Sequence, residues 1–170
     1  MRIFFTTILL CISTIVSAQT KEWKTHKSDS CHIEFKVPNT LIISRKDLNG
    51  IKSTLMETKD LTCIYSITAS KFKGYDFSKG NNNDYYQELK KGSLIERSSI
   101  LLDEHSLAYN RMLAKEIKFS IIINKSEYIY YRRFFFRDNF IYQITIGGMR
   151  RHIVDIEANR EKFFNSIIFL

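Results

Sequence analysis

The chain offers few residues whose type and spacing suit catalysis. Nucleophilic catalysis needs a serine or cysteine, a histidine base and an orienting acid brought together in space. The best sequence match to this set is the adjacent pair Cys31 and His32. Both fall on a strand-like run, where neighbouring side chains point to opposite faces, so they are not expected to act together. We therefore predict no catalytic residues and no enzymatic activity.

Metal binding would need several His, Cys or carboxylate ligands at useful spacing. The short-range candidates are Asp103 with His105, which would share a face on a strand, and His152 with Asp155, which would share a face on a helix. Two ligands do not make a site, and solvated polar residues at a turn and at a helix start account for both pairs. The Gly147–Gly148 pair ends a strand-like run rather than forming a phosphate loop. The sequence predicts neither a metal site nor a cofactor.

One group of side chains suits binding rather than catalysis. Arginine and tyrosine are enriched at protein interfaces, and both gather along one strand-like run and beyond the next. The predicted binding residues are Tyr128, Tyr130, Arg132, Arg133, Arg137, Arg150 and Arg151. The alternative is that alternation sends Arg132 and Arg133 to opposite faces, where they pair with local acids such as Glu127 and Glu157. For Arg132 or Arg133 taken singly, we favour local pairing with an acid. A surface that includes Arg150 and Arg151 could still bind an anionic partner.

The overall charge is compatible with such a partner. The chain has 170 residues and a formal net charge of +8 at pH 7, which favours contact with anionic surfaces, polymers or acidic partners. Nucleic acid is not expected as a partner, because the chain begins with an export signal and carries no recognisable nucleic-acid-binding motif.

That export signal occupies the first residues. A short basic start, the apolar run 3–16 and small residues before the cut are typical of a signal peptide, and the run is shorter than the ~18 residues that span a bilayer. We predict a signal peptide over residues 1–18, cleavage near Ala18, and a periplasmic or secreted mature chain without a transmembrane segment. A lipoprotein signal ending at Cys11 fits poorly, because a large residue precedes that cysteine.

The rest of the chain predicts a short arm and one domain. Residues 19–30 are polar and without periodicity, which predicts a flexible lead-in that Trp23 clamps onto the domain. Residues 31–170 predict a single domain, long enough to bury a core. With the signal removed, Cys31 and Cys63 are the remaining thiols, and in an oxidising compartment they either form a disulfide or stay as two buried free thiols.

Alternation and turn residues predict the elements of the first part of this domain. The sequence predicts strands over residues 31–37, 41–43, 61–69 and 94–102, polar turns over 46–50 and 103–106, a loop over 72–83, and a helix over 84–91 capped by Asn83 and stopped by Gly92.

The stretch 115–148 predicts the central sheet, because strand-forming residues fill three consecutive runs over 114–123, 127–136 and 140–147. A two-residue turn at Asp138–Asn139 fixes the register of the last two runs. One face then carries Tyr131, Arg133, Phe135, Tyr142, Ile144 and Ile146, and the other carries Tyr130, Arg132, Phe134, Phe136, Ile141, Gln143 and Thr145. Both faces have enough apolar surface to need cover, and helical spacing over 152–165 predicts a helix on one of them.

This layout resembles the PsbP-like family in the broad sense. The resemblance is carried by an early strand ending in Phe35-Lys36-Val37-Pro38, a tyrosine-bearing helix near the middle, an aromatic hairpin, and a last helix leading into Lys162 to Phe169. It covers residues 31–169 and implies an α+β fold, an α/β/α sandwich around a central antiparallel sheet. Similar bacterial proteins are exported and of unknown function, and the family implies a binding or assembly scaffold rather than an enzyme.

Two functions follow as expectations. The first is a non-enzymatic exported accessory protein that binds another protein or an anionic envelope component through a face or edge of the sheet. The second is a small-molecule or lipid carrier that uses a cleft between sheet and helix. A deep apolar pocket would favour the carrier, and a shallow surface with exposed arginine and tyrosine would favour the accessory protein.

Overall fold

The computed structural model describes residues 22–94 and 98–170. The predicted signal peptide over residues 1–18, its cleavage near Ala18 and the cysteine at position 11 lie outside the described residues. None of the helices in the described ranges is long and apolar enough to cross a bilayer.

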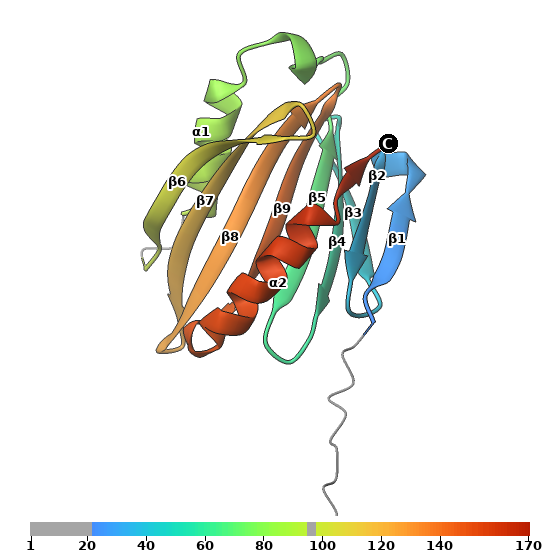
Figure 1. Cartoon of the computed structure of the whole chain (residues 1–170). Coiled ribbons are helices and arrows are strands. Elements are labelled where there is room, and N and C mark those ends of the chain that lie inside the picture. The colour runs from blue at the N-terminus through green and yellow to red at the C-terminus, as the bar shows by residue number, and fades with distance from the viewer. Residues whose placement is uncertain (1–21, 95–97) are drawn as a thin grey trace, which may run out of the picture.

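Two antiparallel sheets make up most of the described chain (Figure 1). The seven-stranded sheet has the order β3-β4-β5-β9-β8-β7-β6, and the three-stranded sheet has the order β1-β2-β10. The strands are β1 (Lys24–Ser28), β2 (Ile33–Val37), β3 (Ile42–Leu48), β4 (Ile51–Lys59), β5 (Ile64–Lys71), β6 (Ile100–Tyr109), β7 (Met112–Ile123), β8 (Ser126–Arg137), β9 (Phe140–Met149) and β10 (Ile168–Phe169). The helices are α1 (Asn83–Ser93) and α2 (Ile153–Asn165), with 3-10 turns η1 (Asp29–Cys31), η2 (Phe77–Lys79) and η3 (Arg150–His152). The expected α+β class is confirmed.

The predicted central sheet is confirmed in position, and the predicted register of its last two runs is confirmed. The three runs form β7, β8 and β9, and β8 pairs β9 through Arg133 opposite Ile144 and Phe135 opposite Tyr142. Because side chains alternate along each strand, these pairs divide the large sheet into the two predicted faces. We call them the α2 face, which carries Arg133, and the α1 face, which carries Arg132.

The α2 face has the larger hydrophobic core. Ile156, Phe163 and Phe164 of α2 belong to one buried cluster with strands of both sheets. Tyr65 of β5 meets Phe163 edge to face, with ring centroids 5.3 Å apart. Trp23 packs on the same Tyr65 at 5.4 Å, as expected of a residue that clamps the start of the described chain. In Figure 1, α2 lies across the large sheet with the small sheet beside it.

The α1 face has a smaller core under a shorter helix. Tyr86 of α1 packs against Phe134 with ring centroids 5.4 Å apart, and the buried cluster there adds Ile117 and Phe119. Cover on this face is therefore concentrated near β7 and β8. Ser66 and Thr68 of β5, on the same face, stay partly exposed.

Three sequence predictions are wrong because they concern exposed segments. Residues 24–28 form β1, which pairs along its length with β2. They are therefore not part of a flexible lead-in. The polar turn predicted over 46–50 is confined to residues 49–50, because β3 continues to Leu48. The turn predicted over 103–106 lies inside β6. A strand at the edge of a sheet needs little apolar surface, so polar composition did not reveal these strands.

Smaller differences concern element ends. The strand predicted over 94–102 begins at Ile100 in the described part, and residues 95–97 lie outside it. Helix α1 begins at Asn83, after Asn82, and runs through Gly92 to Ser93. The strand predicted over 61–69 spans Ile64–Lys71.

Both described cysteines are buried and free, so Cys31 and Cys63 form no disulfide here. Burial raises the pKa of the Cys63 thiol, which disfavours the reactive thiolate. This matches the second alternative left open by the sequence, that of two buried thiols.

Candidate functional site

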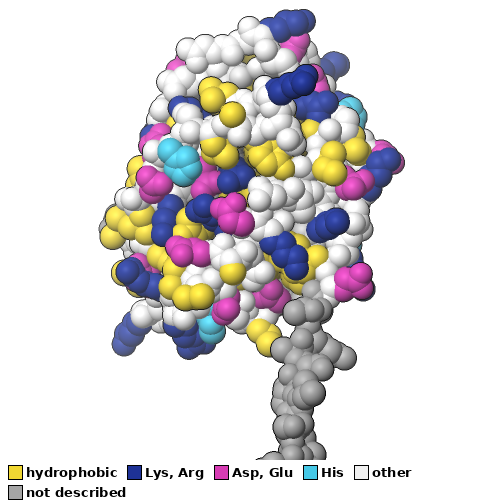
Figure 2. All heavy atoms as spheres, viewed as in Figure 1, with side chains coloured by type: hydrophobic (Ala, Val, Ile, Leu, Met, Phe, Trp, Pro, Cys, Tyr) yellow, Lys and Arg dark blue, Asp and Glu magenta, His cyan; other side chains and the backbone are white. Residues whose placement is uncertain are grey.

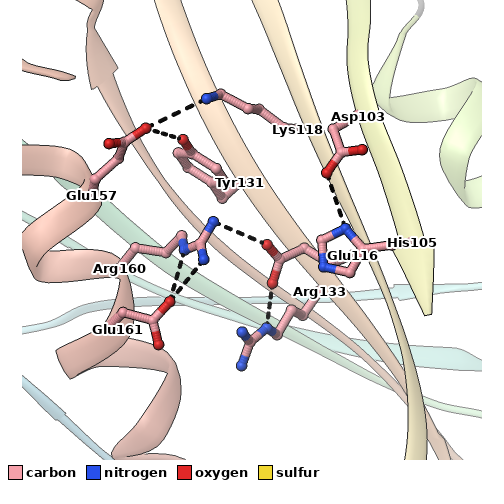
Figure 3. Close-up of polar contacts among 9 residues, drawn as sticks. All are labelled: Asp103, His105, Glu116, Lys118, Tyr131, Arg133, Glu157, Arg160 and Glu161. Carbon is pink, nitrogen blue, oxygen red and sulfur yellow. Dashed lines mark hydrogen bonds and ion pairs between the residues drawn. The ribbon is translucent and has the colours of Figure 1, made fainter. Parts of the chain in front are cut away.

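Arg133, one of the predicted binding residues, lies in the interior. Its Nε donates to Glu116 of β7, and the two side chains are 7% and 1% exposed. Arg160 of α2 adds a second contact, with its Nη1 3.4 Å from the other oxygen of Glu116. The Arg133 guanidinium also lies 4.2 Å from the Phe164 ring centroid. Arg133 is therefore a structural cation in the ion-pair network of Figure 3.

A separate set of contacts in Figure 3 is centred on Glu157 of α2. Glu157 accepts a 2.8 Å hydrogen bond from the Tyr131 hydroxyl and lies 3.4 Å from Lys118. The Tyr131 hydrogen bond, followed by Lys118, lowers the pKa of Glu157. The sequence prediction that Glu157 pairs with one of the two central arginines is wrong, because Lys118 and Tyr131 occupy that carboxylate.

Arg132 points to the opposite face and is also inside. Its Nε donates to the Thr145 hydroxyl at 2.9 Å and its Nη1 to the Ser93 hydroxyl at 2.7 Å. The guanidinium lies over the Phe119 ring, 5.5 Å from its centroid. Burial lowers the pKa of Arg132 to about 10, so it stays charged at neutral pH. Arg132 ties α1 to the sheet and is only partly exposed.

The other predicted arginines lie at opposite ends of β8. Arg137 is at the β8–β9 turn, 3.3 Å from Asp138. Arg150 is at the far end of β9, where its Nη1 is 2.7 Å from Glu127, and Arg151 donates to His152 at 3.1 Å. A strand rises about 3.3 Å per residue, so the length of β8 separates Arg137 from Arg150.

The predicted tyrosines lie toward the Arg150 end. Tyr128 and Tyr130 stack with ring centroids 6.4 Å apart, and Tyr130 stacks on Phe119 at 5.4 Å. The structure thus brings Tyr128, Arg150 and Arg151 together and separates them from the other predicted residues. The seven residues do not form one continuous surface.

A basic surface of which the sequence prediction contained only Arg137 lies at the opposite end, around the turns at residues 49–50, 110–111 and 138–139. We call it the basic end. Its basic side chains are Arg45, Lys46, Lys52, Lys71, Lys73, Lys79, Arg111, Lys115 and Arg137. The acidic residues among them are fewer, namely Asp47, Asp76, Asp84, Glu104 and Asp138. Figure 2 shows Lys and Arg side chains at this upper end of the molecule.

Two grooves open at the basic end. The α1 groove, of about 940 Å³, lies between the start of α1 and the sheet, and its walls include Phe77, Tyr86, Phe136, Arg111 and Lys115. The Lys115 ammonium lies 5.5 Å from the Tyr86 ring centroid.

The η1 groove, of about 510 Å³, lies on the α2 face between η1 and strands β3, β4 and β5. Its walls include Arg45, Lys52 and Lys71, with Ser30 and Phe140. The residues of this groove are scattered over positions 30–140, so no local motif could have indicated it.

The described residues contain no group of three or more His, Cys, Asp or Glu side chains placed to hold a metal ion. The two pairs considered from the sequence do meet: His105 Nδ1 lies 3.0 Å from Asp103, and His152 Nδ1 lies 3.9 Å from Asp155. Each remains a pair at the surface.

Fold and surface together define a class of protein, an α+β domain with a large open antiparallel sheet and a basic, grooved end. No protein-family model matches the chain, and no curated protein matches it in sequence. Solved structures do match, and the fold is PsbP-like, as the sequence resemblance implied. The solution structure of cyanobacterial PsbP from Synechocystis has a TM-score of 0.61 and 9% identity, covering 94% of this chain and 99% of that chain.

Two further structures are similar. A protein from Bacteroides thetaiotaomicron has a TM-score of 0.50 and 18% identity, over 86% of this chain and 48% of that one. A protein of unknown function from Pseudomonas aeruginosa has a TM-score of 0.48 and 12% identity, over 82% of this chain and 91% of that one. At these identities the similarity concerns the fold alone.

Proposed function

We propose that the chain is a non-enzymatic, exported accessory protein that binds another protein or an anionic envelope component through its basic end. The observation that carries the proposal is the excess of lysine and arginine there, where basic residues outnumber acidic ones around three turns of the large sheet. Such an excess attracts anionic partners and speeds their association.

The opposite end supports the choice by contrast. Arg150 is held by Glu127 at 2.7 Å, and Arg151 donates to His152 at 3.1 Å. Arg150 thus has a carboxylate partner, as Arg137 has at the basic end, and the predicted site at Arg150 and Arg151 has fewer basic side chains than the basic end.

We also propose that the layers of this structure correspond to the α/β/α sandwich implied by the resemblance. In this description α1 is a thin layer on one face, and α2 with the small sheet forms the other layer. The β3–β5 part of the α1 face is then left open beside the basic end.

The test is a pull-down from envelope fractions with the chain from Gln19 onward. The variant Lys73→Glu/Arg111→Glu reverses two exposed charges at the basic end, and Arg150→Glu/Arg151→Glu is the matched control at the other end. We expect the first variant to lose partners that the wild type and the control retain. Equal recovery of the same partners by all three proteins would refute binding through the basic end.

A second candidate, a small-molecule or lipid carrier, is favoured by the α1 groove. Its volume of about 940 Å³ lies within the range of ligand sites, and it has the expected position between helix and sheet. Native mass spectrometry of the gently purified protein should then show a bound ligand. Leu113 lines the groove and is 70% exposed, so Leu113→Glu should release that ligand without unfolding the protein. A ligand-free wild-type spectrum would count against the carrier.

A further inference from the structure

The η1 groove is built on an unusual row of side chains across four strands. Asp47 of β3 pairs with Lys52 of β4, Lys52 pairs with Lys71 of β5, and Lys71 pairs with Phe140 of β9. Arg45 lies two residues before Asp47 and therefore on the same face. The register thus places three cations on adjacent strands of one surface.

Lys52 directly opposite Lys71 is an unfavourable arrangement for folding alone. Side chains that face each other on antiparallel strands have Cβ atoms about 4.5–5.5 Å apart, and like charges at that separation destabilise the sheet. None of the ion pairs among the described residues includes Arg45, Lys52 or Lys71. Asp47 is the one carboxylate among the residues that line the groove. The groove therefore keeps a positive charge that a bound anion could balance.

Small side chains give this charge a concave setting. Thr54 and Ala69 pair across β4 and β5 in the row beside the lysines, and both line the groove. Ser30 of η1 lines the opposite wall and offers a hydroxyl donor. The remaining volume of about 510 Å³ suits a small group and its carrier.

Phe140 gives the end of the groove a fixed apolar wall. It is 2% exposed, the Lys71 ammonium lies 5.4 Å from its ring centroid, and the His32 ring packs against it at 5.4 Å. A cation held against an aromatic ring is partly positioned before a ligand arrives.

We propose that the η1 groove binds a phosphate group, with Arg45, Lys52 and Lys71 as its cationic partners and Ser30 as a hydroxyl donor. This inference rests on the proposed function, for which it names the chemistry of the anion. Two ammonium groups and one guanidinium match a compact oxyanion with more than one negative charge, because charge-assisted hydrogen bonds to phosphate are strong and arginine can engage two oxygens. The phosphate is either free or carried on a lipid headgroup.

The first experiment titrates the full mature chain with inorganic phosphate and follows backbone amide shifts by NMR. We expect shifts centred on Lys52, Thr54, Ala69 and Lys71. The variant Lys52→Gln/Lys71→Gln should weaken binding by about tenfold for each lysine removed, since each removes a charge-assisted hydrogen bond. The control Arg150→Gln/Arg151→Gln removes the same charge at the other end and should bind as the wild type does. Equal affinity in the lysine variant would overturn the assignment.

A second arm distinguishes the two sources of phosphate. Vesicles of phosphatidylcholine with phosphatidic acid should capture the wild type by flotation if the ligand is a headgroup. Binding of inorganic phosphate without capture by these vesicles assigns a soluble phosphate compound. Failure of both probes overturns the proposal.

Folding and partner controls keep the outcomes separate. Removing the facing lysines should leave the melting temperature unchanged or raise it, so weaker binding would not reflect unfolding. If Lys52→Gln/Lys71→Gln binds no less phosphate than the wild type while Lys73→Glu/Arg111→Glu still loses its envelope partners, the proposed function stands and the groove assignment fails.

Discussion

Arg132 and Arg133 are neighbours in β8, and both are largely buried, but the two faces of the sheet hold them in different ways. On the α2 face Arg133 pairs with Glu116, which Arg160 also contacts at 3.4 Å. On the α1 face Arg132 donates to the hydroxyls of Thr145 and Ser93. A largely buried arginine can thus be stabilised by an opposite charge or by neutral acceptors. Removing Arg133 leaves a carboxylate without its main partner, whereas removing Arg132 leaves only hydroxyl groups without a donor.

The largest effect is expected from breaking the charged arrangement. Arg133→Met removes the main partner of Glu116, whose side chain is 1% exposed. Leaving a buried charge without its partner typically costs about 3–5 kcal/mol, which urea unfolding would measure. Glu116→Gln/Arg133→Met should recover part of the loss, because it also removes the stranded carboxylate. A loss below about 1 kcal/mol for the single variant would show that Arg160 alone satisfies Glu116.

A smaller effect is expected on the other face. Arg132→Met leaves the hydroxyls of Thr145 and Ser93 without this donor, but Ser93 keeps its own 2.8 Å bond to the Leu89 carbonyl. We expect a loss of about 1–2 kcal/mol in urea unfolding. Arg132→Lys, which keeps the charge but not the guanidinium geometry, is the control. A loss as large as that of Arg133→Met would remove the distinction between the faces.

The smallest effect concerns two carboxylates, one per face, that each accept from a tyrosine. Glu104 accepts from Tyr86 at 2.6 Å and lies 3.0 Å from Lys90, while Glu157 accepts from Tyr131 at 2.8 Å. In each case the tyrosine hydrogen bond is the main cause that lowers the carboxyl pKa from its ordinary 4.5. Tyr86→Phe should therefore raise the pKa of Glu104, and Tyr131→Phe that of Glu157, as followed by NMR titration.

The sign of the stability effect follows from these lowered pKa values. A carboxyl with a lower pKa when folded contributes stability above pH 4.5 and loses it as the pH falls through the lowered value. Glu104 is the less exposed of the two, at 31% against 53% for Glu157, so Tyr86→Phe should weaken the acid-side pH dependence more than Tyr131→Phe. The reverse order would show that exposure does not govern the difference.

The sequence was most informative where strands are long and at least half buried. The two-residue turn at Asp138–Asn139 predicted the β8–β9 register correctly. The same kind of turn fixes the partner of Arg133, because β7 and β8 also join through a two-residue turn at Asn124–Lys125, with positive φ at both positions. Lysine stands where glycine usually indicates such a turn, and the predicted runs 114–123 and 127–136 leave a break of three residues. A three-residue break shifts the register by one position, so the pairing of Glu116 with Arg133 is not predicted.

The candidate sites were harder to predict for a topological reason. The η1 groove depends on the pairing of β4 with β5, and the elements predicted from the sequence do not include residues 51–60, where β4 lies. Edge strand β3 is exposed at every position, so its sequence lacks the alternation that identifies a half-buried strand. Cationic residues at 45, 52 and 71 become neighbours only once these registers are known.

The small sheet has a consequence for the order of assembly. Strand β2 pairs on one side with β1 and on the other with β10, through Ile33 opposite Phe169, and the amide of Leu170 donates to the His32 carbonyl at 3.0 Å. Contacts between residues so distant in sequence form late and slow folding. The small sheet, which lies next to η1, is therefore complete only after residues near the two ends of the described range have paired, and we expect it to form late in folding.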